Sequence, residues 1–331
     1  MFKIPAEKSK SRKILLPIGI FLTITVVSVV GVFSWRVFYY SFVGDDSVAY
    51  ETTKEKSSQE IKDYLSNYVL TDPNKPVLVT AGSYLISDLK TKEKIIGRNE
   101  NKVYPIASVS KLMTAVVSLE NYNQNATTSV SKIASKTYGN KNKLKAGEKI
   151  KIGDLLYPLL LESNNASTEV LAEFGGRDLF IKEMNNKAKS LGMLDTHFDD
   201  PSGLSPNNVS TAEDLLKLVD YIYQNYKFVF DISKEKSHKI GLHNWGNVNN
   251  LIGMRYYVGG KNGYTEEANR TLVSLFDIPL AKDQNRLVAL VLLSSGDRKK
   301  DTNSLINYVA DFVTYGGRNG FVPTKLSLPK T

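Results

Sequence analysis

The sequence is poor in the residues that most often bind metals or form covalent cross-links. It contains no cysteine and three histidines, His197, His238 and His243, in 331 residues. Without cysteine the chain can form neither a disulfide nor a thiolate nucleophile, and it cannot ligate zinc through sulfur. The histidines form no H-E-x-x-H motif and no other close pair of ligands. We therefore expect no metal site, and a zinc hydrolase is poorly supported.

The chain is basic, but its charge does not follow a nucleic-acid-binding pattern. The net charge is +9, and residues 1–13 contribute five basic residues against one acidic residue. A modestly basic body can favour an anionic polymer such as cell wall or nucleic acid. However, the sequence has no basic stripe interleaved with aromatic residues and no nucleic-acid motif. We expect no nucleic-acid partner, and a solvated basic surface is the simplest interpretation.

A long apolar segment follows the basic N-terminus. Residues 14–35 contain no charged residue, and about 20 apolar residues can cross a bilayer as a helix. The segment is longer than a usual signal-peptide core, and no clear small-x-small cleavage site follows it. We predict an uncleaved transmembrane anchor over 14–35; a cleaved signal peptide is the alternative. Because the basic cluster precedes the span, residues 1–13 should stay cytoplasmic and the body should be exported, which predicts a single-pass protein of the cell membrane.

Beyond the anchor, the sequence divides into a polar stalk and one folded domain. Residues 36–75 are polar and charged, and the Asp-Pro pair at 72–73 marks the boundary of a domain predicted over 76–316. We predict strands within 77–98 and at 254–261, 270–277 and 286–294, helices at 108–122 and 300–314, a mainly helical middle, and a tail at 317–331. This order predicts an α/β fold of the α+β type, with one sheet built from both ends of the domain beside a helical lobe.

A serine and a lysine at the start of the predicted helix 108–122 form an S-x-x-K group. Residues three apart on a helix share a face, so the Ser108 hydroxyl and the Lys111 amine can come within hydrogen-bond reach. A serine hydroxyl needs a base to become a good nucleophile, and a lysine can be that base if burial lowers its pKa. The pattern itself is weak, because S-x-x-K occurs five times in the chain. A helix-capping serine is the alternative, and only the apolar helix behind Ser108 distinguishes this copy.

Two further polar groups could complete such a site. Ser163-Asn164-Asn165 follows the apolar run LLYPLLL, and its hydroxyl and amide could relay a proton and hold a substrate; a polar helix start is the alternative. The Gly-rich stretch 259–263 surrounds Lys261. Its glycines would let a bound peptide lie against the backbone, and the lysine would raise the local positive potential; a Gly-rich hairpin turn is the alternative.

Together the three groups resemble the active-site set of the penicillin-binding serine acyltransferases, in which S-x-x-K, S-x-N and K-T-G occur in this order. Four segments narrow the resemblance to the low-molecular-mass D-alanyl-D-alanine carboxypeptidases: YPIASVSKLMTA, LKAGEKIKIGDLLYPLLLESNNAS, DDPSGLSPNNVSTAEDL and GGKNGYTEEANRTLVS. The resemblance covers about residues 78–314. It implies a β-lactamase/transpeptidase-like fold, with an antiparallel sheet flanked by helices. It also implies a serine peptidase that acts on peptidoglycan peptides ending in D-Ala-D-Ala, is inhibited by β-lactams and needs no cofactor.

The resemblance also implies roles for individual residues. Ser108 would be the acylated nucleophile and Lys111 its general base, while Ser163 and Asn165 would assist proton transfer and hold the substrate. The backbone N–H groups of Ser108 and Tyr264 would form the oxyanion hole. The substrate-binding set implied in this way is Lys261, Asn262, Gly263, Tyr264 and Arg298. For Arg298, an exposed loop arginine is the alternative interpretation.

One departure from the family pattern leaves the substrate open. The family usually has Thr or Ser where this chain has Asn262, at a position whose hydroxyl contacts the substrate carboxylate. An asparagine amide also donates hydrogen bonds, but it is longer and bulkier. The alternatives to a carboxypeptidase are therefore a D,D-endopeptidase that cuts peptidoglycan cross-links and a catalytically weak wall-binding homologue. A β-lactamase has less support, because no segment resembles its deacylating glutamate loop.

Overall fold

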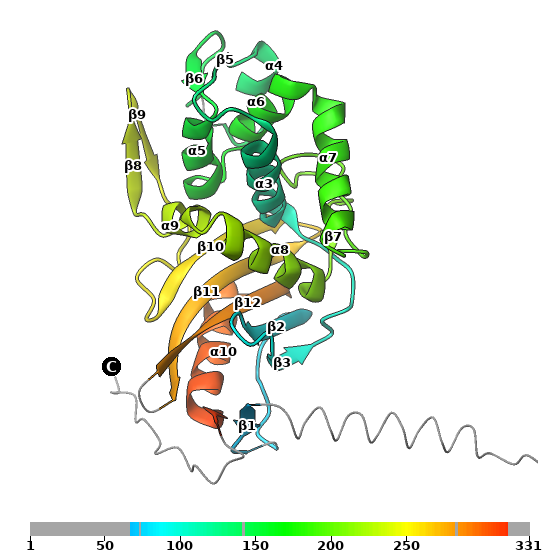
Figure 1. The fold of residues 1–331 in the computed structure, drawn as a ribbon, viewed down its shortest axis with the longest axis vertical. Helices are drawn as coiled ribbons and strands as arrows, with labels where there is room; N and C mark the ends of the chain where they lie inside the picture. Colours follow the sequence, from blue (N-terminus) through cyan, green and yellow to red (C-terminus); the bar gives the residue numbers. More distant parts are fainter. Residues whose placement is uncertain (1–66, 73, 141–142, 282–283, 317–331) are drawn as a thin grey trace, which may run out of the picture. The chain divides into compact units, whose positions relative to one another are not determined.

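Five antiparallel strands from both ends of the domain form the central sheet, in the order β10-β11-β12-β2-β3. They are β2 (Ser83–Asp88), β3 (Lys94–Arg98), β10 (Tyr257–Thr265), β11 (Asn269–Ala281) and β12 (Gln284–Ser295). The computed structural model describes residues 67–72, 74–140, 143–281 and 284–316. Within these residues, the pairing of β12 with β2 joins the C-terminal hairpins to the N-terminal one (Figure 1). The sheet predicted from both ends of the domain is therefore confirmed.

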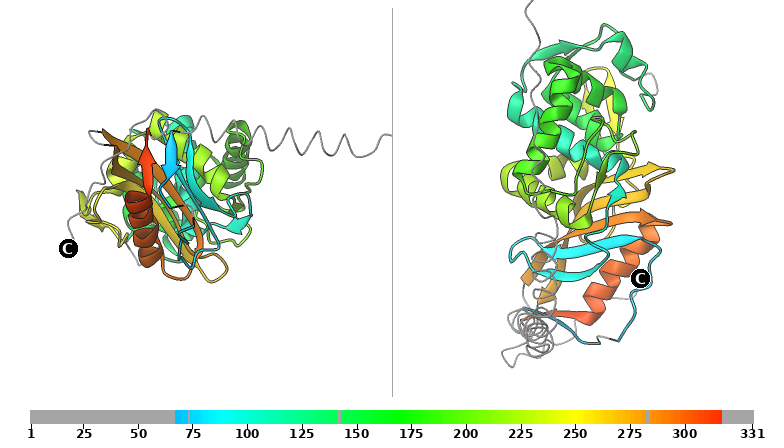
Figure 2. Two further views of the ribbon diagram at one scale, coloured as in Figure 1. Left: turned by 90° about the horizontal axis from the view of Figure 1, so that it is seen from below. Right: turned by 90° about the vertical axis from the view of Figure 1, so that its right-hand side faces the viewer.

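Alternate residues of the strands bury two separate apolar cores. Leu85, Val273 and Val291 face the helical lobe, whereas Ile86, Leu272 and Leu290 pack toward α10 (Arg298–Phe312). This period of two is what a sheet covered on both faces requires. Figure 2 shows α10 on one side of the sheet and the remaining helices on the other.

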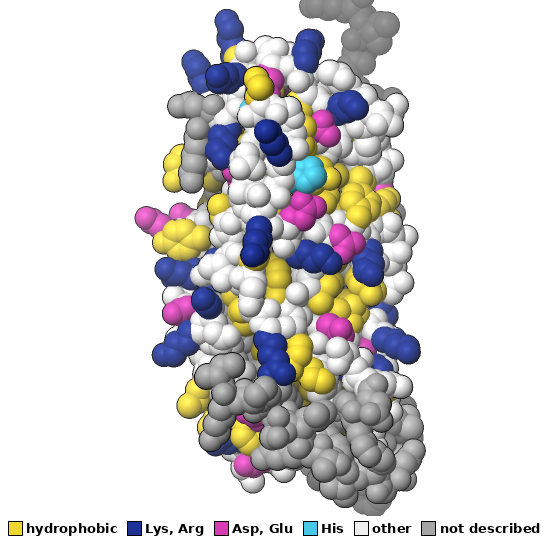
Figure 3. Space-filling model, turned by 90° about the vertical axis from the view of Figure 1, so that its left-hand side faces the viewer, with side chains coloured by type: hydrophobic (Ala, Val, Ile, Leu, Met, Phe, Trp, Pro, Cys, Tyr) yellow, Lys and Arg dark blue, Asp and Glu magenta, His cyan; other side chains and the backbone are white. Residues whose placement is uncertain are grey.

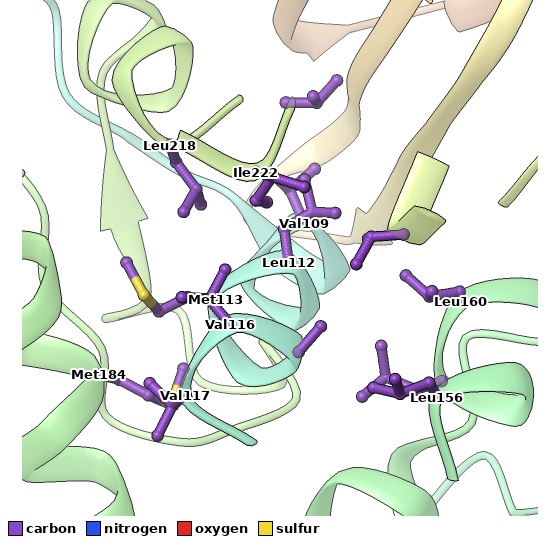
Figure 4. Packing of buried hydrophobic residues seen from close by; sticks show 14 of the residues in the cluster. Val109, Leu112, Met113, Val116, Val117, Leu156, Leu160, Met184, Leu218 and Ile222 are labelled. Atoms are coloured by element: carbon purple, nitrogen blue, oxygen red, sulfur yellow. The ribbon is translucent and has the colours of Figure 1, made fainter. Parts of the chain in front are cut away.

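The helical lobe is built around α3 (Lys111–Asn121), which the 3₁₀ turn η1 (Ala107–Ser110) precedes. Val109, Leu112, Met113, Val116 and Val117 of this stretch are all buried, and Figure 4 shows them packed against helices on several sides. A helix that is apolar on nearly every side belongs in a core. The helix predicted at 108–122 is therefore present, but its first turn is 3₁₀ rather than α.

The other elements of the lobe surround α3. Its helices are α4 (Lys132–Ser135), η2 (Gly153–Leu155), α5 (Leu156–Leu161), α6 (Asn165–Gly175), α7 (Arg177–Ser190), α8 (Ala212–Asn225) and α9 (Phe228–Ser233). Three short two-stranded ribbons accompany them: β4 (Tyr104–Pro105) with β7 (Val209–Ser210), β5 (Thr127–Ser129) with β6 (Lys149–Lys151), and β8 (Ser237–Ile240) with β9 (His243–Gly246).

A further ribbon joins the two ends of the described chain. β1 (Tyr68–Leu70) pairs with β13 (Val313–Tyr315) in antiparallel register. The sequence had placed residues 36–75 in a stalk, so the fold described here begins several residues before 76. The physical reason is a pairing partner more than 240 residues away in sequence, which no local pattern reveals.

The Gly-rich stretch 259–263 lies inside β10, so the alternative of a hairpin turn does not apply. Its register with β11 pairs Lys261 with Val273 and Gly263 with Thr271. Pairing along a sheet edge compensates for the low strand preference of glycine. The predicted strand 254–261 therefore starts later and extends through Thr265.

The predicted anchor at 14–35, the cytoplasmic tail at 1–13 and the tail at 317–331 lie outside the described residues. Within the part of the chain that is described, no helix is long and apolar enough to cross a bilayer. On the face shown in Figure 3, lysine and arginine side chains are spread among acidic and apolar ones from one end to the other. The positive charge of this face is therefore dispersed.

Candidate active site

The 3₁₀ turn aligns the Ser108 hydroxyl with the Lys111 amine. Side chains three residues apart eclipse one another in 3₁₀ geometry, and Lys111 Nζ lies 3.1 Å from Ser108 Oγ. No side chain caps η1 or α3. The S-x-x-K spacing thus produces a hydroxyl–amine contact, and the alternative of a capping serine does not apply.

Lys111 is completely buried and has only neutral partners in hydrogen-bond contact. Its Nζ donates to Asn165 Oδ1 at 2.6 Å and to the Ser202 carbonyl at 2.6 Å. Burial lowers the pKa of Lys111 to about 7, against a weaker opposing attraction from Asp200 and Glu169. A large fraction of this amine is consequently free of its extra proton near neutral pH, which a general base requires.

The backbone around Ser108 is strained and firmly held. Ala107 has a φ of 48°, a left-handed value that is costly for a residue with a Cβ. The carbonyl of Ile106 accepts from Thr271 at 2.9 Å, and the carbonyl of Ala107 accepts from Ser110 at 2.8 Å. Gly203 packs so closely that a Cβ on it would lie 1.9 Å from the Ala107 oxygen. Strand β11 and the segment around Gly203 therefore hold the turn that presents Ser108.

A second hydroxyl–amine pair lies beside the first. Lys261 Nζ donates to Ser163 Oγ at 3.0 Å and to the Asn262 carbonyl at 2.7 Å. Lys261 is buried, and burial, then repulsion from Lys111 and Arg298, holds its pKa well below the ordinary value. Ser163 also has a left-handed φ of 56°, so both serine hydroxyls are presented from strained turns.

Asn165 contacts the first pair through Lys111. It opens α6, where Asn164 supplies the N-cap by accepting from the Ser167 N–H at 3.0 Å. The cap therefore uses Asn164, which frees the Asn165 amide to contact Lys111. The sequence-predicted residues Ser108, Lys111, Ser163, Asn165 and Lys261 converge on one centre.

Strand β10 closes this centre along one side. A Cβ on Gly263 would lie 2.8 Å from the Ser108 nitrogen, so only glycine lets the strand come so near the nucleophile. Asn262 is half-buried, and its Oδ1 lies 3.5 Å from Lys261 Nζ. Tyr264 is 59% exposed, and the Arg270 guanidinium lies over its ring at 5.4 Å from the centroid.

Arg298 is not a free loop arginine. It begins α10, and its Nη1 donates to the Gly263 carbonyl at 3.1 Å. Burial, then the positive charge of Arg270, lowers the pKa of this guanidinium. The side chain thus supports β10 directly behind Ser108 and adds positive potential at that end of the site.

Sequence reasoning missed a group that holds Lys111 from the opposite side. The Ser202 carbonyl accepts from Lys111, and Asp200 accepts from the Ser202 and Gly203 backbone N–H groups at 2.6 and 2.8 Å. Burial alone would raise the pKa of Asp200, but these hydrogen bonds lower it below its usual range. The signal was present in the segment DDPSGLSPNNVS, where an aspartate, proline and glycine predict a tight polar turn.

Among the described residues, no three His, Cys, Asp or Glu side chains cluster as ligands for a metal ion. The arrangement instead offers two hydroxyl–amine pairs, Ser108 with Lys111 and Ser163 with Lys261. Such a set performs acyl transfer by general-base and covalent catalysis.

Two curated proteins with named activities are similar to this chain in sequence. A D-alanyl-D-alanine endopeptidase of Pseudomonas aeruginosa is 33% identical over 59% of this chain and 66% of its own length. A D-alanyl-D-alanine endopeptidase of Escherichia coli is 34% identical over 66% of this chain and 72% of its own length. The chain thus spans about two thirds of the length of these relatives.

Two crystal structures support the same relationship. A D-alanyl-D-alanine carboxypeptidase of Mycobacterium tuberculosis is 26% identical, covers 72% of this chain and 95% of its own, and superposes with a TM-score of 0.65. Penicillin-binding protein D2 of Listeria monocytogenes, in its cefotaxime-bound form, is 26% identical, covers 71% of this chain and 99% of its own, and has a TM-score of 0.64.

The sequence profile of peptidase family S11, D-alanyl-D-alanine carboxypeptidase, matches residues 69–296, from β1 to the end of β12. This match includes every sequence-predicted site residue except Arg298. The chain belongs to the D-alanyl-D-alanine carboxypeptidase family of serine peptidases.

Proposed function

We propose that this protein is a serine D-alanyl-D-alanine carboxypeptidase that removes the terminal D-Ala from peptidoglycan stem peptides through an acyl-enzyme on Ser108. The observation that carries the proposal is the 3.1 Å contact between Ser108 Oγ and a buried lysine whose pKa is lowered to about 7. A buried ammonium group without a bonded carboxylate destabilises the fold, so a lysine kept in this environment points to a site that uses the neutral amine.

The proposed reaction follows from the contacts. Lys111 Nζ takes the proton as Ser108 Oγ attacks the carbonyl carbon between the two D-alanines. The backbone N–H groups of Ser108 and Tyr264 stabilise the negative charge on the carbonyl oxygen. The C–N bond then breaks, and the proton that Lys111 took passes to the leaving D-Ala amine, with Ser163, held by Lys261, as the proposed relay. This transfer leaves Lys111 neutral again. Water, activated by the free amine of Lys111, hydrolyses the ester and regenerates Ser108.

Penicillin labelling tests this proposal. Penicillin-binding protein D2 has been crystallised with cefotaxime and with ampicillin, and we propose that β-lactams likewise acylate Ser108 here. The full chain should be labelled by a fluorescent penicillin, whereas Ser108→Ala should not. Labelling of the Ser108→Ala protein at another residue, or no labelling of folded wild type, would contradict the assignment.

A D,D-endopeptidase is a second candidate, because the relatives from Pseudomonas aeruginosa and Escherichia coli carry that name. The two activities share the acyl-enzyme and differ in the leaving group. A carboxypeptidase must recognise a free terminal carboxylate, and an endopeptidase must admit a cross-linked side chain. Release of D-Ala from a pentapeptide and cleavage of a cross-linked dimer, measured on the same preparation, distinguish the two; faster dimer cleavage would replace our first choice.

We further propose that residues 14–35 anchor the protein in the cell membrane, with residues 1–13 inside and the catalytic domain outside. The length and apolar composition of the segment and the basic flank before it support this proposal. Protease added to intact cells, after removal of the wall, should degrade the domain and leave a short N-terminal epitope protected. Recovery of the whole protein in the soluble fraction would contradict it.

A further inference from the structure

The loop between α4 and β6 reaches the active site through its backbone. The Tyr138 carbonyl accepts a hydrogen bond from Asn165 Nδ2 at 2.8 Å, although the Tyr138 side chain is 81% exposed. The other end of the same amide, Oδ1, accepts from Lys111 Nζ. The amide of Asn165 is therefore held between a lysine on one side and a loop carbonyl on the other.

This pair of contacts selects one orientation of the amide. A carbonyl only accepts hydrogen bonds, so it binds the NH₂ end and excludes the flipped rotamer. In the flipped rotamer the NH₂ group would face Lys111 Nζ, and the lysine N–H that now donates to Oδ1 would lose its acceptor. The Tyr138 carbonyl thus keeps an acceptor directed at the proposed general base.

Buried side chains hold the loop in this position. Asn140 is 2% exposed, and its Nδ2 donates to the Ser135 and Leu144 carbonyls at 2.7 and 2.9 Å. Its Oδ1 accepts from the Leu144 N–H at 3.1 Å and from Asn164 Nδ2 at 3.3 Å. Asn140 therefore ties both sides of the loop to the N-cap of α6, one residue before Asn165.

A glycine places the loop against the amide. Gly139 has a φ of +84°, and a Cβ built on it would lie 3.0 Å from Asn165 Nδ2. A contact of this length is tighter than side chains normally accept, so any larger residue would push on the Asn165 amide itself.

We propose that segment 138–140 is a positioning device for the general base. It acts through Asn165, fixes the direction of the hydrogen bond to Lys111 and thereby sets the pH at which Lys111 can accept the proton of Ser108. The proposal rests on the proposed function and names a residue set outside the S-x-x-K, S-x-N and K-x-G groups.

Two glycines allow a matched test. Gly147 has a φ of +83° and nothing within 4 Å of a Cβ built on it. Gly139→Ala and Gly147→Ala thus add the same methyl group at nearly the same φ, but only the first contacts Asn165. The rate constant of acylation by fluorescent penicillin should be measured for both variants and the wild type between pH 5 and 9.

The expected result is specific to position. Gly139→Ala should lower the plateau rate constant about 10-fold or more, because small misplacements of catalytic groups are that costly. The acidic limb of its pH–rate profile should also move to lower pH, because loss of the Asn165 acceptor disfavours the ammonium form of Lys111. Gly147→Ala should keep the wild-type limb and a rate constant within about twofold of it, since nothing near the site changes.

A purely structural role predicts a different outcome. If segment 138–140 only stabilised the fold, Gly139→Ala would reduce the labelled fraction and leave the limb unmoved, and the proposal would be wrong. Asn140→Leu provides a second measurement, because it keeps roughly the size of the side chain, adds no charge and removes both donor bonds; it should shift the limb in the same direction. Wild type that is never labelled at Ser108 would instead contradict the proposed function.

Discussion

The two faces of the central sheet both bury charged groups, and they treat them in opposite ways. On the α10 side, Arg286 forms an ion pair with Asp88, Arg286 Nε lies 2.7 Å from a carboxylate oxygen, and the Tyr68 hydroxyl donates to the same carboxylate. On the lobe side, Lys111 and Lys261 contact only hydroxyl, amide and carbonyl groups.

The presence or absence of a bonded carboxylate distinguishes a stabilising buried charge from a catalytic one. A buried charge with a buried counter-ion keeps its ionised state, and here the pair fastens the β1–β13 ribbon to the sheet. A buried lysine without a bonded carboxylate loses its proton more easily, because nothing compensates for its lost hydration. Buried lysines without a bonded carboxylate, rather than buried charges in general, mark the candidate active site.

The strongest test of this comparison replaces the unpaired lysine. Lys111→Met should reduce the rate constant of penicillin acylation about 10³-fold, the range in which a general base contributes. Its melting temperature should equal or exceed that of the wild type, because an apolar side chain needs no compensation for burial. A lower melting temperature with only a small loss of acylation would mean that Lys111 is a structural residue.

Replacing the paired cation should have the opposite effect. Arg286→Met leaves Asp88 buried and uncompensated, so the free energy of unfolding should fall by about 3–5 kcal/mol. The folded fraction should still be acylated at the wild-type rate. Denaturant unfolding followed by circular dichroism gives the first quantity and penicillin labelling gives the second. If the free energy of unfolding of Arg286→Met equalled that of the wild type, the proposed difference between the two faces of the sheet would be wrong.

The pH dependence refines the comparison without a mutation. Acylation needs Lys111 as the free amine, and burial lowers the pKa of this group to about 7. The rate constant should therefore be nearly constant above that pH and fall about tenfold for each unit below it. Labelling rates measured from pH 5 to 9 give this profile directly. An acidic limb near pH 10, the ordinary lysine range, would show that the amine keeps its proton.

The smallest expected effect concerns the edge of the site. Asn262 stands on β10 beside Lys261, where the K-T-G pattern has a threonine. Asn262→Thr should raise the rate of D-Ala release from a diacyl tripeptide a few-fold, about the value of one better-placed hydrogen bond. Penicillin acylation of the same protein serves as the control for an intact centre. A slower release would indicate that the asparagine is adapted to a different substrate.

The sequence predicted the site better than it predicted its surroundings. The three motifs, together with the family-like segments around them, selected Ser108, Lys111, Ser163, Asn165 and Lys261, and the structure brings these side chains together. The sequence could not reveal that Asn164 takes the cap of α6 and so frees Asn165, because both asparagines suit that position.

Errors in the elements arose where long-range pairing competes with local preference. The predicted strand 254–261 was ended among the glycines, yet pairing with β11 carries the strand on to Thr265. Residues 68–70 looked like stalk, yet β13 pairs with them across the domain. In both places the deciding hydrogen bonds come from residues remote in sequence, which local propensity does not contain.

By itself, the sequence determined the alternation of apolar residues that forms two cores, the apolar helix behind Ser108 and the set of side chains able to perform acyl transfer. Only the tertiary structure decided which amine loses its proton. A lysine becomes a base through complete burial and through the neutral partners around it. Here those partners come from Asn165 and Ser202, 54 and 91 residues further along the chain from Lys111, and no local pattern can bring them together.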